Sequence, residues 1–161
     1  MNNTFPTEGN LSGLSRKDFQ KEINNKETDL FILKNKKGME VAVTNYGCAI
    51  LSIMVPDKNG KYANVILGHD SIDHVINSPE PFLSTTIGRY GNRIAKGKFT
   101  LFGEEHELTI NNGPNSLHGG PTGFHARVWD AVQIDEGTVQ FNYVSADGEE
   151  GFPGNCILYT S

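Results

Sequence analysis

The chain has 161 residues, a length that suits one domain of ordinary size. Apolar residues make up 37% and charged residues 20% of the chain, and the net charge is −5. The composition argues against wholesale disorder, and the acidic balance argues against a nucleic-acid partner.

The first 28 residues are predicted to be an N-terminal arm and lead-in, with 11–25 either a short helix or an irregular stretch. They show no basic stretch followed by an apolar one, and no part of the chain approaches the roughly 18 apolar residues of a membrane span. Cys48 and Cys156 form no paired motif, which argues against a disulfide scaffold or a structural zinc site. A cytoplasmic protein with reduced thiols and no membrane partner is expected.

From Asp29 onward, short runs of β-branched and aromatic residues alternate with turn-forming residues, which predicts strands. Asn59-Gly60 predicts a tight hairpin turn, and 71–76 predicts one helical turn capped by Asp70 or Ser71. The predicted strands are 30–33, 39–44, 49–55, 62–67, 98–102, 107–110, 127–134, 139–145 and 157–160. Because no helix of ten or more residues is evident, the pattern predicts an all-β antiparallel sandwich or barrel.

Two long segments, 84–97 and 111–125, are candidates for binding loops, because long loops on a β scaffold commonly carry function. In the first, Arg89, Asn92 and Arg93 offer hydrogen-bonding groups to a polar ligand. An ordinary surface loop, with its arginines paired to acidic residues, is the alternative. The glycine spacing matches neither a Walker loop nor a Rossmann loop, so a nucleotide is not favoured.

In the second loop, His118 lies between an Asn-rich turn and a Gly-Gly pair, where it could exchange a proton near neutral pH. A single histidine is more often a surface residue or a structurally satisfied one, and His69, His74, His106 and His125 are assigned to that class. The HExxH and Gly-x-Ser-x-Gly spacings are absent. Neither a metal site nor a serine nucleophile is therefore proposed.

The segment 147–154 is acidic and rich in glycine. Its paired carboxylates could act as acid and base, as in a glycosidase, but the flanking glycines favour a solvated turn. Phe124 and Trp129 could stack on a sugar ring, although a single Trp on a strand is more often part of a core.

Four segments together resemble the aldose 1-epimerase, or galactose mutarotase, family: Gly88–Ala95, Asn112–Gly120, Gly123-Phe124 before Trp129, and Asp147–Gly154. The resemblance spans about 29–155 and implies a β-sandwich of the galactose mutarotase type. It also implies cofactor-free interconversion of the α and β anomers of free hexoses, such as galactose and glucose, by acid/base ring opening and closure. By position, the resemblance implies that Asn92 and Arg93 bind sugar hydroxyls and that His118 contacts the sugar and helps to orient or polarise it. Arg89 belongs to the same motif and is expected to support the loop.

The resemblance assigns the family's acid histidine and base glutamate to segments after Ser161. Residues 29–161 are therefore predicted to be the N-terminal part of a sandwich, with no catalytic residue of their own and little or no activity alone. Unpaired strand edges and an apolar face would then cause poor solubility or association.

Two other functions remain open at the level of sequence. One is a non-catalytic carbohydrate-binding module, and the other is a hexose-phosphate mutarotase, which would need an extra basic cluster for which Lys96 and Lys98 are the only nearby candidates. A small-molecule sugar is the expected partner, with no cofactor and no metal. The preferred hexose and the oligomeric state stay open.

Overall fold

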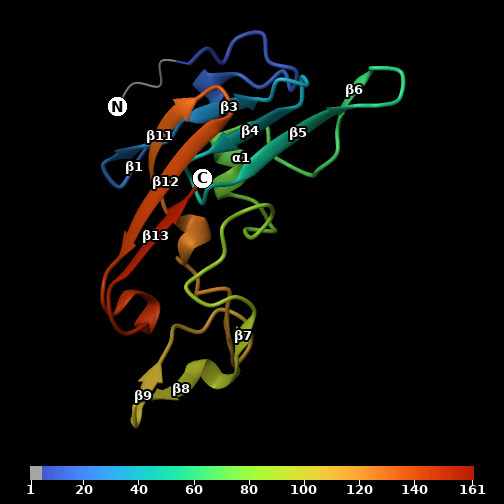
Figure 1. Ribbon diagram of the computed structural model, residues 1–161. Helices are drawn as coiled ribbons and strands as arrows, with labels where there is room; N and C mark the ends of the chain where they lie inside the picture. Colours follow the sequence, from blue (N-terminus) through green and yellow to red (C-terminus); the bar gives the residue numbers. More distant parts are fainter. Residues whose placement is uncertain (1–4) are drawn as a thin grey trace.

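The computed structural model describes residues 5–161, and in this part of the chain two antiparallel β-layers form the main body (Figure 1). One layer has the strand order β3-β4-β5-β6, and the other has the order β11-β12-β13. The strands of these layers are β3 Leu30–Lys34, β4 Glu40–Thr44, β5 Ile50–Pro56, β6 Tyr62–Asn64, β11 Asp130–Asp135, β12 Thr138–Ser145 and β13 Cys156–Thr160. The sandwich is not closed, because β11 and β13 remain edge strands of a separate sheet.

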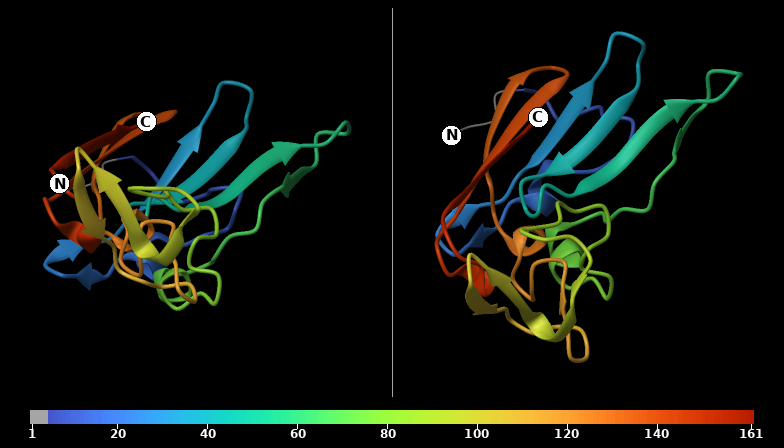
Figure 2. Two further views of the ribbon diagram at one scale, coloured as in Figure 1. Left: turned by 90° about the horizontal axis from the view of Figure 1, so that it is seen from below. Right: turned by 60° about the horizontal axis from the view of Figure 1, so that its bottom comes forward.

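Short elements surround the two layers. The paired short strands are β1 Glu22–Ile23 with β2 Lys26–Glu27, β7 Arg93–Ile94 with β10 Ser116–Leu117, and β8 Lys98–Leu101 with β9 Glu104–Glu107. The helical turns are η1 Arg16–Phe19, α1 Ile72–Ile76, η2 Ala95–Gly97, η3 Phe124–Ala126 and η4 Glu149–Gly151. Figure 1 shows β7, β8 and β9 together below the two layers, and Figure 2 shows the β5–β6 arm projecting away from them. No helix in the described part is long and apolar enough to cross a membrane.

Strand β3 is buried on both faces, which explains its unbroken apolar sequence. Successive side chains of a strand point to opposite faces, so a continuous apolar run needs a packing layer on each side. Leu30 and Ile32 pack with Phe19 of η1 and Val75 of α1. Phe31 packs on the other face, against residues of β11 and β12.

The second core joins the two sheets through aromatic side chains. Phe31 and Phe141 meet edge to face with ring centroids 5.8 Å apart, and Phe124 meets Trp129 in the same way at 5.7 Å. Trp129 is only 1% exposed, and its indole N–H donates to the carbonyl of Phe124 at 3.1 Å. The expectation that Trp129 belongs to the core is confirmed.

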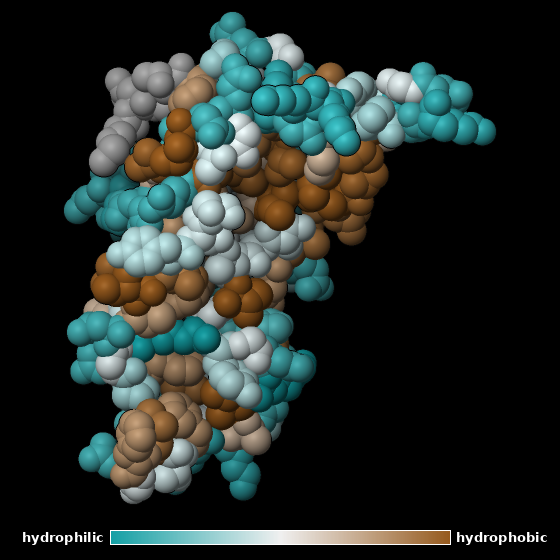
Figure 3. Space-filling model, in the orientation of Figure 1, coloured by the Kyte–Doolittle hydropathy of each residue, from teal (hydrophilic) through white to brown (hydrophobic). Residues whose placement is uncertain are grey.

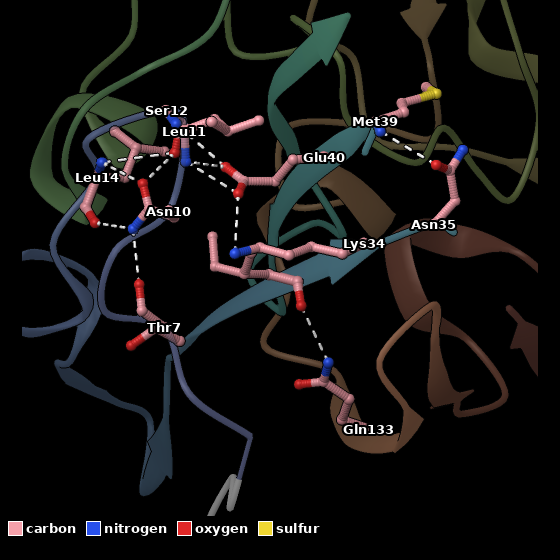
Figure 4. Close-up of polar contacts among 11 residues, drawn as sticks. Thr7, Asn10, Leu11, Ser12, Leu14, Lys34, Asn35, Met39, Glu40 and Gln133 are labelled. Atoms are coloured by element: carbon pink, nitrogen blue, oxygen red, sulfur yellow. Dashed lines mark hydrogen bonds and ion pairs between the residues drawn. The ribbon is translucent and has the colours of Figure 1, made fainter. Parts of the chain in front are cut away.

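The N-terminal segment packs onto the four-stranded sheet through a buried carboxylate (Figure 4). The side chain of Glu40 is fully buried and accepts hydrogen bonds from the backbone N–H of Leu11 at 2.8 Å and of Ser12 at 3.1 Å. Lys34 Nζ lies 3.4 Å from the same carboxylate. Residues 11–25, left open between a short helix and an irregular stretch, contain η1 and β1, and β2 follows directly after them. The division at residue 29 stays a prediction. Of the predicted loose arm, residues 1–4 lie outside the described part.

Three predicted strands differ from the observed ones because local polar contacts and turns redirect the backbone. Strand β6 ends at Asn64, whose side chain accepts from the N–H of Ile53 in place of the ladder. Strand β9 ends at Glu107 instead of beginning there, because Phe102 and Gly103 form a tight turn with φ values of 52° and 87°. The strand predicted at 127–134 begins only at Asp130.

The predicted helical turn and hairpin are both present. Ser71 caps α1 by accepting from the N–H of His74 at 3.4 Å. The hairpin turn spans Asp57 to Gly60, closed by the Gly60 N–H donating to the Asp57 carbonyl at 3.0 Å. Gly60 has a φ of 81°, whereas Asn59 is not left-handed, so the turn lacks the two successive positive φ angles that an Asn-Gly hairpin turn usually has.

Candidate sugar-binding site

The two long loops meet through a short antiparallel ladder. Leu117 of β10 pairs with Arg93 of β7, and the backbone N–H of His118 continues the ladder by donating to the Asn92 carbonyl at 3.0 Å. Residues that are 26 positions apart in the sequence therefore lie side by side. The structure brings together the three residues predicted to bind substrate.

The ring of His118 is held in one protonation pattern by the other loop. The backbone N–H of Asn92 donates to His118 Nδ1 at 2.9 Å. Because a backbone N–H can only donate, Nδ1 must be the acceptor, and the proton of the neutral ring lies on Nε2. His118 and Asn92 both have left-handed backbones, with φ of 53° and 65°, and the reciprocal bonds hold them in these uncommon conformations. The site thus presents a fixed imidazole N–H donor.

Arg93 is oriented by two amide side chains. Its Nε donates to Asn112 Oδ1 at 2.9 Å, and its Nη1 donates to Asn92 Oδ1 at 3.3 Å. Both contacts are exposed, so the guanidinium stays accessible to a ligand. A planar donor group and an imidazole N–H on the same pair of loops suit the oxygen atoms of a neutral polyhydroxyl compound.

Arg89 supports the first loop, as predicted, and its donors are used within the protein. Its Nε donates to Ser145 Oγ at 2.8 Å, and its terminal nitrogens donate to four carbonyl oxygens. Those carbonyls belong to Ser145 and Ala146 at the end of β12 and to Pro153 and Gly154 after η4. Arg89 therefore ties the loop to the acidic turn.

The acidic turn is not the solvated turn that the sequence predicted. The side chain of Glu149 is 16% exposed, forms an ion pair with Arg127 Nη2 at 2.8 Å and accepts from the hydroxyls of Tyr143 and Ser145. Burial, together with Glu149, raises the pKa of Tyr143 to about 12. The turn folds back against the end of β12, where charged and hydroxyl partners offset the burial of the carboxylate.

His125 is buried, and the ring of Phe82 contacts both His125 and His118. The Phe82 ring centroid is 4.8 Å from that of His118 and 4.5 Å from that of His125. Burial lowers the pKa of His125 to about 4, and Glu150 opposes this shift while His118 and Arg127 add to it. His125 is therefore neutral near pH 7 and fits the structural role assigned to it.

The nearby basic and apolar groups do not extend the predicted site. Lys98 forms ion pairs with Glu105 and Glu107 across the β8–β9 hairpin. A cavity of about 570 Å³ next to Arg93 is lined mainly by apolar side chains and by neither Asn92 nor His118. Among residues 5–161, no cluster of three His, Cys, Asp or Glu residues could hold a metal ion.

Known proteins resemble this chain in both sequence and structure. Residues 29–158 match the family model described as "Aldose 1-epimerase". The chain belongs to the aldose 1-epimerase family. It is 43% identical over 125 residues to the galactose mutarotase of Bos taurus, covering 76% of this chain and 36% of the relative. It is 40% identical over 126 residues to the aldose 1-epimerase of Escherichia coli strain K12, covering 78% of this chain and 36% of the relative.

A solved member of the aldose 1-epimerase family has the same fold in this region. The crystal structure of the Caenorhabditis elegans aldose epimerase homologue superposes with a TM-score of 0.77 at 31% identity, over 82% of this chain and 40% of the other. The predicted galactose mutarotase type of all-β fold is confirmed. The chain spans little more than a third of the curated relatives it matches.

Sequence reasoning missed several residues that build this part of the aldose 1-epimerase fold. Phe82 carries no motif signal, because its role depends on two rings more than 30 positions away. Asn112 lies inside a recognised motif, yet its contact with Arg93 depends on the pairing of β7 with β10. Glu149 and Glu150 were noticed, but the flanking glycines gave no sign that both carboxylates fold inward.

Proposed function

We propose that Asn92, Arg93 and His118 form the sugar-binding part of a mutarotase site for free hexoses such as galactose or glucose. The observation that carries this proposal is the hydrogen bond from the Asn92 N–H to His118 Nδ1, which leaves Nε2–H as a fixed donor. The Arg93 guanidinium, held by the side chains of Asn92 and Asn112, adds directional donors on the same pair of loops. Such an arrangement suits a neutral sugar with several hydroxyl groups.

The proposed reaction is interconversion of the α and β anomers. A base removes the proton of the anomeric hydroxyl while an acid protonates the ring oxygen, the ring opens to the aldehyde, and closure on the other face gives the second anomer. The family resemblance assigns the acid and the base to positions outside these 161 residues. We therefore expect residues 1–161 to bind hexose without accelerating anomerisation, in a protein that we expect to be cytoplasmic.

The hexose-phosphate alternative is weaker because of Lys98. A phosphate needs unpaired basic groups near the loops, and Lys98 is held by Glu105 and Glu107. Lys96 is the remaining candidate. The non-catalytic carbohydrate-binding module shares the proposed binding residues and differs only in activity when the whole family domain is present.

Titration of the 15N-labelled chain with galactose, glucose and galactose 6-phosphate tests the proposal. We expect the free hexoses to shift the amide signals of Asn92, Arg93 and His118, and the phosphate ester to bind no more tightly. Polarimetry of freshly dissolved α-galactose should show no acceleration over buffer by these residues. Absence of any shift at the three residues would reject the site, and rapid anomerisation would reject the assignment of acid and base elsewhere.

The carbohydrate-binding module is separated from the enzyme by a complementation experiment. A chimera joins residues 1–158 to the remaining part of the Bos taurus galactose mutarotase, with which this chain is 43% identical in the aligned region. Anomerisation by the chimera that depends on His118 supports the enzyme. Galactose binding by a folded chimera without anomerisation favours the module.

A further inference from the structure

The carboxylate of Glu150 contacts the loop that follows His118. Glu150 Oε1 accepts a hydrogen bond from the backbone N–H of Thr122 at 3.1 Å and another from the Thr122 hydroxyl. Its own backbone carbonyl accepts from the Thr109 N–H at 3.1 Å, which anchors the residue to the segment after β9. Glu150 is thus fixed at its backbone and reaches the second loop with its side chain.

The same loop is confined on its other side by the first loop. A Cβ atom at Gly119 would collide with the carbonyl oxygen of Gly88, and the Phe124 N–H donates to that oxygen at 3.2 Å. A Cβ atom at Gly120 would collide with the carboxylate of Glu150. Residues 119–124 are therefore held between Gly88 and Glu150, directly after the histidine of the site.

The backbone of Glu150 is in a conformation that favours glycine. Its φ of 53° is left-handed, and it lies between Gly148 and Gly151, whose φ values are 80° and 87°. Side chains with a Cβ are disfavoured in this region, so a glycine would fit the backbone of this turn better than a glutamate. A glycine, however, could not make the hydrogen bonds that the Glu150 carboxylate makes with Thr122.

We infer that Glu150 is a positioning residue for His118, acting through Thr122 and the turn 119–122 to keep the imidazole beside Asn92. This inference rests on the proposed hexose-binding function and extends it to the acidic turn. The carboxylate does not need to touch the sugar. It restrains the turn that directly follows His118, the residue that presents the Nε2–H donor.

The 15N-labelled 161-residue chain and four variants test this role. Glu150→Gln removes the charge at nearly constant shape, and Thr122→Val removes the hydroxyl while Thr122→Ser retains it. Glu104→Gln is the matched control, because it changes an exposed carboxylate of β9 for which the described residues show no side-chain hydrogen bond. The readouts are the imidazole nitrogen signals of His118, amide exchange at Thr122 and the Kd for galactose.

For Glu150→Gln and Thr122→Val, we expect the His118 nitrogens to lose the pattern of a single Nε2–H tautomer. Hydrogen exchange at the amide of residue 122 should accelerate on the order of tenfold in both variants, because each loses a charge-assisted hydrogen bond between residues 122 and 150. The Kd for galactose should rise roughly three- to tenfold, while Thr122→Ser and Glu104→Gln stay within about twofold of the parent chain.

Three outcomes separate the possibilities. Unchanged His118 signals and an unchanged Kd in Glu150→Gln would overturn the positioning role. Faster exchange spread evenly over β3–β5 would also overturn it, because the residue would then support only global stability. If the parent chain binds no galactose but the His118 signals still change on Glu150→Gln, the proposed function fails and the positioning role stands.

Discussion

At the scale of single residues, the site depends on the atom through which each side chain meets the protein. His118 uses Nδ1 for the Asn92 N–H, so Nε2 remains for a ligand. Arg89 and Arg93 belong to one motif, but their side chains have different roles. Arg89 makes five hydrogen bonds with the end of β12 and the residues after η4. Arg93 stays exposed. Their sequence spacing does not distinguish these two roles.

A pair of His118 variants separates the two ring nitrogens. Asparagine places a side-chain oxygen near the position of Nδ1, so His118→Asn should keep the acceptor for the Asn92 N–H and lose the distal donor. We expect an increase in the galactose Kd of at least about tenfold, with the Asn92 amide still protected from exchange. His118→Gln should instead lose the acceptor for the Asn92 N–H, so that the Asn92 amide exchanges faster. Equal galactose affinity in His118→Asn and the parent chain would contradict the proposed donor.

His125 makes stability depend on pH. Its pKa is about 4 in the folded chain, below the ordinary value of 6.5, mainly because of burial. Between pH 6.5 and about 4 the unfolded chain binds a proton that the folded chain excludes, so stability falls as pH falls, by up to about 1.4 kcal/mol per pH unit. Above pH 6.5 this contribution is absent.

Urea unfolding at pH 7.0 and pH 4.8 measures this loss, and His125→Asn is the comparison. Carboxylates that become protonated at the lower pH change the free energy of unfolding of both proteins alike. The variant should therefore lose less stability than the parent between the two pH values. The same loss in both proteins would show that His125 does not carry the effect.

At the scale of elements, the N-terminal segment is stabilised by a carboxylate in the four-stranded sheet. Glu40 is fully buried and accepts from the N–H groups of Leu11 and Ser12, whereas its ion-pair partner Lys34 is about half exposed. Loss of Glu40 removes the buried acceptor of these two part-buried backbone hydrogen bonds. Loss of Lys34 removes only a solvent-screened interaction.

We therefore expect Glu40→Ala to lower the free energy of unfolding by about 2–4 kcal/mol and Lys34→Ala by less than about 1 kcal/mol. Urea unfolding followed by Trp129 fluorescence measures both, because that side chain lies in the core between the sheets. Similar effects of the two variants would show that the ion pair with Lys34, and not the hydrogen bonds from the Leu11 and Ser12 N–H groups, stabilises the segment.

The sequence predicted the main strands well where the apolar pattern reflects a core. Phe31 and Ile32 are buried on opposite faces, and their run was recognisable without any structure. Strand boundaries were predicted wrongly at Asn64, where a side-chain hydrogen bond ends the strand, and at Gly103, where the chain turns earlier than predicted. The three proposed site residues were predicted from motifs and their role stays a prediction, whereas the contact of Glu150 could be seen only in the fold, because its partner Thr122 is 28 positions away.

At the scale of the whole molecule, the open sandwich leaves apolar side chains on the outer face of the three-stranded sheet. Val144, Ile157 and Tyr159 are 61%, 57% and 67% exposed. Val144 and Ile157 are direct partners across β12 and β13, so they form one continuous patch beside an edge strand. Figure 3 shows hydrophobic patches on the face that carries these strands.

We expect the chain to associate as its concentration rises, since an exposed apolar patch beside an unpaired strand edge favours contact between copies. Sedimentation velocity over a range of concentrations measures this, and Val144→Lys with Ile157→Lys should return the protein toward a monomer. Lys substitutions at Val65 and Leu67, which are exposed outside this sheet, are the matched control. A parent chain that stays monomeric at all concentrations would contradict the prediction.

The ties between the two long loops and the segment 145–154 have a consequence for biosynthesis. A ribosome that has completed residue 118 has already made Asn92, Arg93 and His118, but not the carbonyls that bind Arg89 or the carboxylate that binds Thr122. The recognition loops can reach their final order only after that later segment emerges from the exit tunnel. Nascent chains that end before Glu150 should therefore carry Asn92, Arg93 and His118 without the contacts that order their loops.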